Sequence, residues 1–442
     1  MKKKATDILK IIRSLILSDS FKERHKNSLQ WFTRERVFTF HIVLALTLNL
    51  LRRSLQIELY DFLGEMNLSL ASKQAFCSAR QKISSEAYVE INSVLISEFY
   101  KNNDIKLLLD LRFFIIDGST LALPEEPLIR EKFGTCSNGK VKDLIPMARI
   151  STVFDPLNTL TADAIIAPYR SSERDMAIEH LKKIHSLNSG TRDLFIFDRG
   201  YPSIALFFFG KTNNQELLIR ISLEFLPAFA RQKIKNGEND FVIELRAQKL
   251  KGEARKRFKK LMPNVPITSK MSVRVLVIDL ENGEKEYLMT TLMDSGKFHH
   301  AIFGEIYNMR WGTEEGYKFI KIDAEIENFS TKTILGIEQE FYGTIVMSNV
   351  RALLANEAQE EFELEKIKPC KYEHKINRNI SLGILKNGFV KVLFNDNESI
   401  DDFCERAKCL MKKNTIPIRK GRKFPRKRKA VRRHHITIRR NL

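Results

Sequence analysis

The chain has 442 residues, of which 43% are hydrophobic and 29% are charged, and its formal net charge is +20. This apolar fraction is sufficient for a sizeable core and excludes an intrinsically disordered protein. The excess of Lys and Arg indicates a polyanionic partner, either nucleic acid or an anionic membrane surface. The charge is uneven, because 14 basic residues and no acidic ones lie between Lys412 and Arg440.

No segment predicts export or membrane insertion. Polar Thr6 and Asp7 follow the basic start of the chain, and no small-residue cleavage site appears. The most apolar stretch, residues 37–51, contains His41 and Asn49 and is shorter than the roughly 20 apolar residues that a bilayer span requires. We expect a buried helix there, no membrane partner and a cytoplasmic location.

The five cysteines are scattered through the sequence: Cys77, Cys136, Cys370, Cys404 and Cys409. No pair has the Cys-x₂-Cys spacing of a zinc site, Cys404 and Cys409 have no second pair nearby, and the number is odd. We therefore expect reduced thiols, as in a cytosolic protein.

Residues 1–106 predict a helical domain. Apolar residues recur there at helical spacing, as at Ile8, Ile11, Ile12 and Leu15. Several basic residues are interspersed among them: Arg34, Arg36, Arg52, Arg53, Arg80 and Lys82. This pattern suits a DNA-binding domain, but a solvated helix face explains the segment equally well.

Four short apolar runs after residue 107 predict β-strands, at residues 111–116, 149–154, 160–166 and 194–197. The first run ends at Asp117-Gly118, which indicates a turn, and an Asp-Pro-Leu-Asn segment makes the second and third a hairpin. Ser172 is the expected cap of a helix that ends near Leu187, and Pro202 opens another helix.

The order strand, strand, strand, helix, strand, helix matches the first half of a ribonuclease H-like α/β core, over residues 107–216. In that fold the first and fourth strands lie side by side. Asp117 and Asp198, which follow these two strands, are therefore expected to be neighbours.

A β-rich insertion is predicted over residues 217–292. Strands at 273–279 and 286–292 flank an Asn-Gly pair, a strong hairpin signal, and a basic, loop-like region precedes them at 249–260. Residues 293–411 are expected to complete the core and to add C-terminal helices, including an apolar one at 334–355. The basic tail, 412–442, is expected to be disordered without DNA.

Residues 303–321 predict a helix with one polar face. At about 100° per residue, five side chains fall within an arc of about 80°: Tyr307, Arg310, Glu314, Tyr317 and Lys321. Glu315 falls well outside this arc, so the spacing selects Glu314 as the site residue. Considered alone, the stripe is better explained by surface salt bridges, each worth about 0.3–0.5 kcal/mol.

The combination of Asp117, Asp198 and Glu314 indicates phosphoryl transfer. That reaction depends on in-line geometry and on positive charge at the attacking and leaving oxygens, which two metal ions supply. Mg²⁺ prefers a few carboxylates together with substrate phosphate, so we predict two Mg²⁺ ions, with Mn²⁺ as a possible substitute. Arg310 and Lys321 are expected to hold DNA phosphates.

Three motifs resemble the DDE transposases of the insertion-sequence-four family. Its Tyr-x₂-Arg-x₃-Glu-x₆-Lys signature is matched by Tyr307, Arg310, Glu314 and Lys321. Its first two carboxylate segments are matched by Asp-Gly-Ser-Thr from residue 117 and by Asp-Arg-Gly-Tyr from residue 198. Two N-terminal segments, 32–36 and 74–82, also resemble the family, so the likeness covers about residues 32–355.

The resemblance implies that Asp117, Asp198 and Glu314 are the catalytic and metal-binding residues. The expected DNA contacts are Tyr307, Arg310, Lys321, Arg199 and Tyr201, with Tyr307 stacking on a base or binding a phosphate. The implied partners are the terminal inverted repeats of an insertion sequence, target DNA and a second copy of the chain, at the bacterial nucleoid. The implied reaction is a nick, then attack of the 3′-hydroxyl on the opposite strand to form a hairpin, then transfer to target DNA.

Two alternatives remain from the sequence. One is a non-catalytic basic DNA-binding protein derived from a transposase. The other is a DDE nuclease that cleaves without strand transfer.

Overall fold

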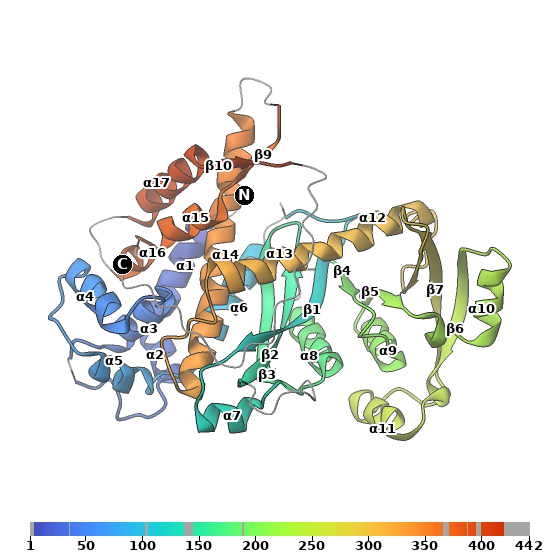
Figure 1. Ribbon diagram of the computed structural model, residues 1–442, viewed down its shortest axis with the longest axis horizontal. Helices are drawn as coiled ribbons and strands as arrows, with labels where there is room; N and C mark the ends of the chain where they lie inside the picture. Colours follow the sequence, from blue (N-terminus) through green and yellow to red (C-terminus); the bar gives the residue numbers. More distant parts are fainter. Residues whose placement is uncertain are drawn as a thin grey trace.

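The computed structural model describes residues 4–34, 36–101, 105–136, 145–187, 190–365, 371–386, 388–394 and 399–419. An eight-stranded mixed sheet runs through the molecule, in the order β3-β2-β1-β4-β5-β8-β7-β6 (Figure 1). β1 is parallel to β4 and β4 to β5, whereas the other neighbouring pairs are antiparallel. The strands are β1 Arg112–Ala122, β2 Met147–Asp155, β3 Leu160–Pro168, β4 Asp193–Phe197, β5 Gln215–Ile221, β6 Asp240–Arg246, β7 Lys270–Asp279 and β8 Lys285–Thr290.

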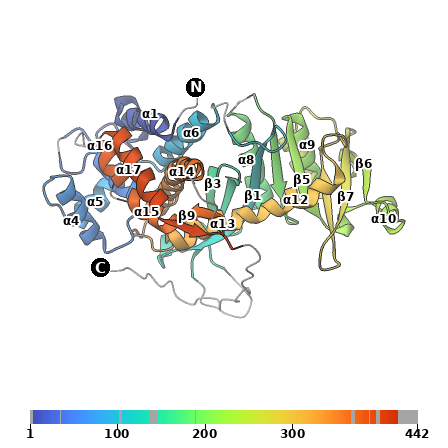
Figure 2. The ribbon, with the colours of Figure 1, turned by 90° about the horizontal axis from the view of Figure 1, so that it is seen from above.

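Helices cover both faces of the central strands. α8 (Glu173–His185) and α9 (Ile204–Thr212) lie on one side, and α12 (Phe303–Asn308) and α13 (Gly312–Lys318) lie on the other (Figure 2). Successive side chains of a strand point to opposite faces, so residues 113–116 of β1 and 194–197 of β4 are all apolar and fill both layers. Ile116 and Phe197 belong to one buried cluster, and Ile115 and Ile196 to the other.

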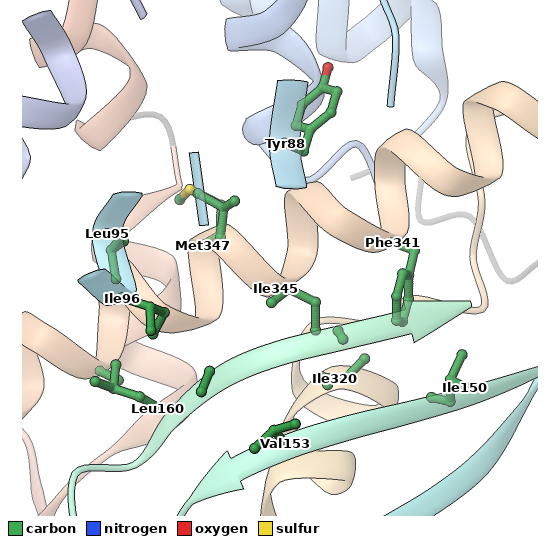
Figure 3. Close-up of a cluster of buried hydrophobic side chains, with 14 of the residues drawn as sticks. Tyr88, Leu95, Ile96, Ile150, Val153, Leu160, Ile320, Phe341, Ile345 and Met347 are labelled. Carbon is green, nitrogen blue, oxygen red and sulfur yellow. The ribbon is translucent and has the colours of Figure 1, made fainter. Parts of the chain in front are cut away.

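The N-terminal helices and the long helix α14 form a second packed region beside the sheet. The N-terminal helices are α1 Ala5–Leu17, α2 Asp19–His25, α3 Phe40–Leu48, α4 Leu55–Glu65, α5 Lys73–Arg80 and α6 Glu86–Tyr100. α14 (Ile334–Leu364) packs against both α6 and β3, and Figure 3 shows Ile345 and Phe341 of α14 beside the β2–β3 hairpin. A helix enclosed in this way needs apolar residues on more than one face.

The remaining elements are peripheral to the site. They are α7 Pro127–Phe133, α10 Ala228–Lys235, α11 Gly252–Leu261, α15 Arg378–Leu385, α16 Gly388–Phe394, α17 Ile400–Lys413, and the short strands β9 His374–Ile376 and β10 Thr415–Pro417. Within the described ranges, no helix is both long enough and apolar enough to span a bilayer.

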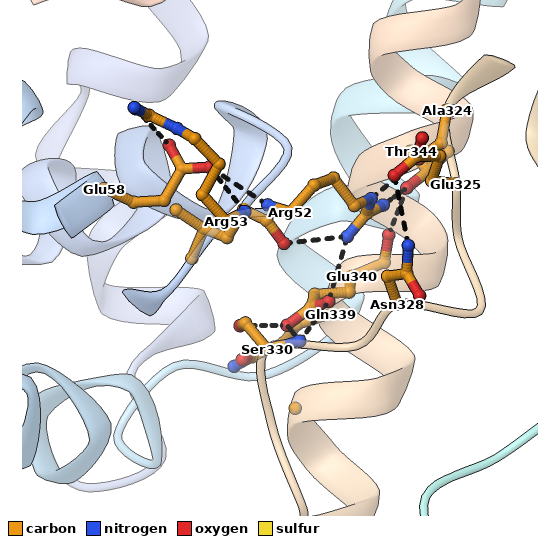
Figure 4. Close-up of polar contacts among 12 residues, drawn as sticks. Arg52, Arg53, Glu58, Ala324, Glu325, Asn328, Ser330, Gln339, Glu340 and Thr344 are labelled. Atoms are coloured by element: carbon orange, nitrogen blue, oxygen red, sulfur yellow. Dashed lines mark hydrogen bonds and ion pairs between the residues drawn. The ribbon is translucent and has the colours of Figure 1, made fainter. Parts of the chain in front are cut away.

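A buried ionic network joins the N-terminal helices to α14. The Glu340 carboxylate accepts hydrogen bonds from Arg80 Nη1 at 2.9 Å and from Arg52 Nη1 at 3.2 Å. Arg52 Nε also donates to the carbonyl of Ala324 at 2.7 Å, in the segment that leads into α14 (Figure 4). Because the side chains of Arg80 and Glu340 are 2% and 1% exposed, each charge depends on the other for compensation.

Most of the expected core elements are confirmed. The structure is a mixed α/β fold, the hairpin forms as β2 and β3, and β1 lies beside β4. Ser172 caps α8 by accepting a hydrogen bond from the backbone N–H of Asp175. The apolar stretch at 37–51 contains the buried helix α3.

One expectation about the sheet is wrong. The chain does not turn at Asp117-Gly118: β1 continues to Ala122, because β2 pairs with it there, with Gly118 opposite Ser151. The strands after residue 217 join the central sheet. β5 pairs with β4, and β8 pairs with β5, so β6–β8 extend the central sheet.

Two basic segments are also more ordered than expected. Most of the loop-like region at 249–260 is helix α11, which is anchored by Phe258 packing edge-on against Phe208. The first residues of the basic tail are structured as well: Lys412 and Lys413 end α17, and Thr415–Pro417 pairs with β9. The rest of the tail, 420–442, lies outside the described residues.

The buried network predicts a large stability effect for Glu340→Gln. The substitution leaves two buried guanidinium groups without their counter-charge, so we expect the free energy of unfolding to fall by about 3–5 kcal/mol. Urea denaturation measures it. Glu363→Gln, an exposed position on the same helix, is the control and should change stability by less than about 0.5 kcal/mol. Equal effects of the two substitutions would show that the network does not hold these regions together.

Candidate active site

The register of β1 and β4 brings the two predicted aspartates together. Ile116 and Phe197 are the last parallel pair of these strands, and Asp117 and Asp198 are the next residue on each. Neighbouring strands lie about 4.8 Å apart. Side chains alternate along a strand, so both carboxylates point toward the face that α12 covers, as Ile115 does.

The third predicted carboxylate lies on the helical segment that crosses this face. The expected helix at 303–321 is present, but it includes a 3₁₀ turn at Met309–Trp311 and ends in a π-helical turn at Phe319–Asp323. Close packing holds it against the β2–β3 hairpin: a Cβ added at Gly316 would lie 3.3 Å from Phe154 Cδ2. Glycine at this position therefore lets the helix approach the sheet that carries Asp117.

Two tyrosines attach this segment to the strand ends. The Tyr317 hydroxyl donates to the carbonyl oxygen of Asp117 at 2.6 Å. The Tyr307 hydroxyl lies 3.3 Å from Asp198 Oδ1 and 3.4 Å from the carbonyl oxygen of Phe197. Burial raises the pKa of both hydroxyls, so both remain protonated donors.

Asp117 and Glu314 line one cavity of about 790 Å³, together with Ser119 and Lys321. Lys321 Nζ donates to Ser119 Oγ at 2.7 Å, which places a cation at the edge of this cavity. Glu315, one residue further along, instead forms ion pairs with Lys318 at 2.6 Å and Arg378 at 2.8 Å. Glu314 therefore lines the cavity whereas Glu315 forms ion pairs elsewhere, in agreement with the helical spacing.

Arg310 is the cation nearest to Asp117. Its Nη1 lies 3.9 Å from Asp117 Oδ2, and its guanidinium carbon lies 4.8 Å from the centre of the Trp311 ring. The pKa of Asp117 is raised to about 6, chiefly by burial; the nearby Asp198 and Glu173 also raise it, whereas the backbone N–H of Gly118 and Arg310 lower it. The Asp117 carboxylate thus carries a charge that its surroundings neutralise only in part.

Asp117, Asp198 and Glu314 are of the residue type that binds divalent metal ions, although in this structure their carboxylates do not converge on one point. Among the residues that the structure describes, no three His, Cys, Asp or Glu side chains are close enough to share an ion. Carboxylate oxygens are nonetheless the ligands that Mg²⁺ and Mn²⁺ prefer. The raised pKa of Asp117, next to a second aspartate, also marks a position where positive charge would be favourable.

The expected DNA contacts differ in accessibility. Arg199 is exposed, directly after Asp198. Tyr307 and Tyr201 are only 3% and 1% exposed. Neither ring offers a face to a base in this structure, so the expectation that Tyr307 stacks on DNA finds no support in its position.

A fourth carboxylate, Glu173, was not identified from the sequence. It is the first residue of α8, and it forms an ion pair with Arg149 of β2. A Cβ added at Gly118 would lie 2.8 Å from Glu173 Oε1, so this side chain lies against the backbone next to Asp117. The sequence marked this segment only as a helix start, which gave no sign of the contact.

Comparison with protein families agrees with this geometry. The family model described as Transposase DDE domain matches residues 109–350, which include all three carboxylates. The chain belongs to this transposase DDE domain family. The resemblance to transposases of the insertion-sequence-four type is thereby confirmed.

Two curated relatives of the chain come from Escherichia coli (strain K12). Transposase InsG for insertion sequence element IS4 is 21% identical over 296 residues, which cover 66% of this chain and 62% of the relative. Putative transposase InsZ is 28% identical over 126 residues, which cover 27% of this chain and 41% of the relative. The matches therefore span less than two thirds of either relative.

A solved structure is also similar. It is a cryo-EM structure of a piggyBac transposase synaptic complex with hairpin DNA, with 10% sequence identity and a TM-score of 0.46. The alignment covers 91% of this chain and 85% of that chain.

The raised pKa of Asp117 predicts a pH-dependent stability difference in the metal-free protein. In the folded chain the Asp117 carboxyl keeps its proton up to about pH 6. In the unfolded chain an aspartate loses its proton near pH 4. The contribution of Asp117 to the free energy of unfolding must therefore decrease as the pH rises from about 4 to about 6. Denaturation of the native chain and of Asp117→Asn, in the presence of a chelator, measures it as their difference. A difference that stays constant over this range would contradict the assignment.

Proposed function

We propose that the chain is a cut-and-paste DNA transposase in which Asp117, Asp198 and Glu314 form the catalytic set. One observation carries this proposal: directly after the last parallel pair of β1 and β4, each strand is followed in sequence by an aspartate, and both aspartates face the helix bearing Glu314. Glu314 lines the same cavity as Asp117, and Tyr307 and Tyr317 fasten the helix to both strand ends. Membership of the transposase DDE domain family supports DNA as the substrate.

We propose a ribonuclease H-like core for this site. The strand order β3-β2-β1-β4-β5, with β2 antiparallel to β1 and β4 parallel to it, supports this assignment. In this proposal residues 107–216 and 293–411 make up the core, and residues 217–292 are a β-rich insertion that widens the same sheet. Residues 1–106 are the helical DNA-binding domain, and residues 412–442 are the basic tail.

The three carboxylates would hold two divalent ions, Mg²⁺ or Mn²⁺. When bound, such ions supply positive charge at the attacking and leaving oxygens of a phosphodiester. Lys321 at the edge of the cavity and the exposed Arg199 are suited to hold the flanking phosphates. Buried Tyr307 would orient the Asp198 carboxylate by its hydrogen bond instead of stacking on a base.

The reaction proposed for this site has four steps. A water molecule cleaves one strand at the element end and leaves a 3′-hydroxyl. That hydroxyl attacks the opposite strand to form a hairpin, which is reopened, and the freed 3′ ends then attack target DNA. Because two terminal inverted repeats must be held together, we propose that the chain acts as a homodimer on DNA.

A basic groove supports DNA binding by the N-terminal helices. A cavity of about 860 Å³ is lined by Arg34, Arg36 and Lys82, together with the aromatic rings of Trp31 and Phe32. No acidic residue is among the described residues that line it. Cations next to aromatic rings suit a nucleic-acid backbone and its bases.

Substitution of the carboxylates is the direct test of function. Asp117→Asn, Asp198→Asn and Glu314→Gln should each reduce cleavage of a labelled element end by at least about 10³-fold in Mg²⁺, with end binding retained. Glu315→Gln is the matched control and should keep nearly full activity, because Glu315 pairs with Lys318 and Arg378. Cleavage by any of the three site variants would refute the assignment, whereas cleavage without joining to target DNA would identify a nuclease.

The groove predicts a change in salt dependence. Replacing both Arg34 and Arg36 with Ala removes two phosphate contacts, so the slope of log affinity against log salt should become shallower by about 2. Filter binding over a range of salt concentrations measures the slope. Arg130→Ala, which removes an exposed cation already paired with Glu125, is the control. An unchanged slope in the double variant would exclude the groove as a DNA contact.

A further inference from the structure

A second cavity lies on the other side of the helix that carries Glu314. Its volume is about 330 Å³, and Glu315, Gly316 and Phe319 of that helix line it, whereas Glu314 lines the cavity that contains Asp117. The rest of its wall comes mainly from α14, β9 and the first residue of α15, and α15 and β9 both pack against α14 (Figure 2). Two cavities therefore flank one helical segment.

Arg351 of α14 is the buried cation of this second cavity. The residue is 7% exposed, its Nε has no hydrogen-bond partner, and its guanidinium makes no ion pair within the described part of the chain. Burial and the nearby Arg378 lower the pKa of Arg351 to about 10, and Asp323 opposes them, so the side chain stays charged at neutral pH. A buried charge without a partner is costly, and most buried polar groups in proteins are hydrogen-bonded.

Phe319 orients this guanidinium group. The guanidinium carbon of Arg351 lies 4.6 Å from the centre of the Phe319 ring. A ring covers the face of a guanidinium and leaves its in-plane N–H donors free for an acceptor. Phe319 is the first residue of the π-helical turn, and such turns are rare and frequent at functional sites. Ser348, one turn before Arg351 on α14, adds a hydroxyl to the same cavity wall.

The charges around the cavity favour an anion in its buried part. Arg378 also lines it, and Arg378 Nη1 is paired with Glu315 at 2.8 Å. The other two acidic residues of the wall, Glu363 and Glu373, are exposed, so solvent and salt screen their charges. Burial thus separates the cation that lacks a partner from the carboxylates at the rim.

A phosphate group matches this arrangement. Its oxygens accept two parallel N–H bonds from one guanidinium, and such charge-assisted pairs are short and strong. A hydroxyl such as that of Ser348 can donate to a further phosphate oxygen. The volume of the cavity lies at the lower end of the range of small-molecule sites.

We propose that Arg351, together with Arg378 and Ser348, binds a phosphate group, supplied either by the backbone of bound DNA or by free phosphate. The DNA source rests on the proposed function, whereas binding of free phosphate does not. With DNA as the source, the helix that carries Glu314 is held between the cavity of Asp117 on one side and a backbone phosphate on the other.

Arg351→Met is the first test, by thermal melting of the full chain with and without inorganic phosphate. In phosphate-free buffer we expect no loss of melting temperature, because the substitution removes an uncompensated buried charge and keeps an apolar side chain. Phosphate should raise the melting temperature of the native chain more than that of the variant. Arg246→Gln is the control, because Arg246 is exposed and paired with Glu244, and it should respond as the native chain does. Equal phosphate responses of the native chain and Arg351→Met would overturn the proposal.

Arg351→Lys keeps the cation and therefore serves as a second variant if the methionine variant does not fold. Lysine lacks the planar pair of donors, so calorimetric titration with inorganic phosphate should give an affinity about tenfold weaker than that of the native chain. Native affinity in Arg351→Lys would contradict phosphate recognition by the guanidinium group.

Filter binding of a labelled element end distinguishes the two phosphate sources. If DNA supplies the phosphate, Arg351→Met should make the slope of log affinity against log salt shallower by about 1. Ethylation of one backbone phosphate should then weaken binding by the native chain but not by the variant. An unchanged slope and no such phosphate, together with a lost response to inorganic phosphate, would assign the site to free phosphate.

Failure of this inference can be distinguished from failure of the proposed function. If the carboxylate variants abolish cleavage while Arg351→Met and the native chain respond equally to phosphate, only the phosphate site is lost. If the carboxylate variants still cleave, the response to inorganic phosphate tests the site independently of any DNA.

Discussion

Pairing of Ile116 with Phe197 as the last parallel residues of β1 and β4 is the constraint on which the site depends. A shift of this register by one residue would turn one aspartate to the opposite face of the sheet. The register is strongly specified, because the side chains of residues 113–116 and 194–197 alternate between two buried apolar layers, one on each face of the sheet. The core packing thus fixes the relative positions of Asp117 and Asp198 independently of any contact with metal or DNA.

The helix that carries Glu314 is held to this register from several directions. Tyr317 and Tyr307 bond to the ends of β1 and β4, and Gly316 permits close packing on Phe154. Beyond this helix, Arg52 reaches the carbonyl of Ala324 while it also bonds to Glu340 of α14. Hydrogen bonds of Arg52 therefore link the N-terminal helices to α14 and to Ala324, which follows the helix that carries Glu314. Such contacts provide a physical route by which events at the N-terminal helices could affect the position of Glu314.

Local patterns in the sequence predicted much of the site. Apolar runs located the strands that end at Asp117 and Asp198, and helical spacing distinguished Glu314 from Glu315. The addition of β8, β7 and β6 to the sheet beyond β5 could not be predicted in this way, because it depends on residue pairs that are distant in sequence, such as Leu218 and Thr290. The basic segment that forms α11 was misjudged because its composition is polar, whereas one residue, Phe258, anchors it to the core.

The contacts around Asp117 show the other limit of sequence reasoning. Ser151 belongs to β2, whereas Glu173 and His180 belong to α8, and they meet only after the sheet and α8 have packed. Asp163, which is hydrogen-bonded to His180, offered the one available signal, since a carboxylate in an apolar strand requires a partner. Tyr307 shows a different limit: its signature position predicts contact with DNA, whereas in this structure its ring is buried and its hydroxyl lies against Asp198.

The central claim, that Asp117, Asp198 and Glu314 together hold divalent metal, can be tested by iron-mediated backbone cleavage of the DNA-bound chain. Fe²⁺ replaces Mg²⁺ at oxygen-rich sites, and hydroxyl radicals formed there cut the nearest peptide bonds. The account predicts three cuts, near residues 117, 198 and 314, that an excess of Mg²⁺ suppresses together. Cuts at other positions, or a cut near only one of the three that Mg²⁺ does not suppress, would contradict it.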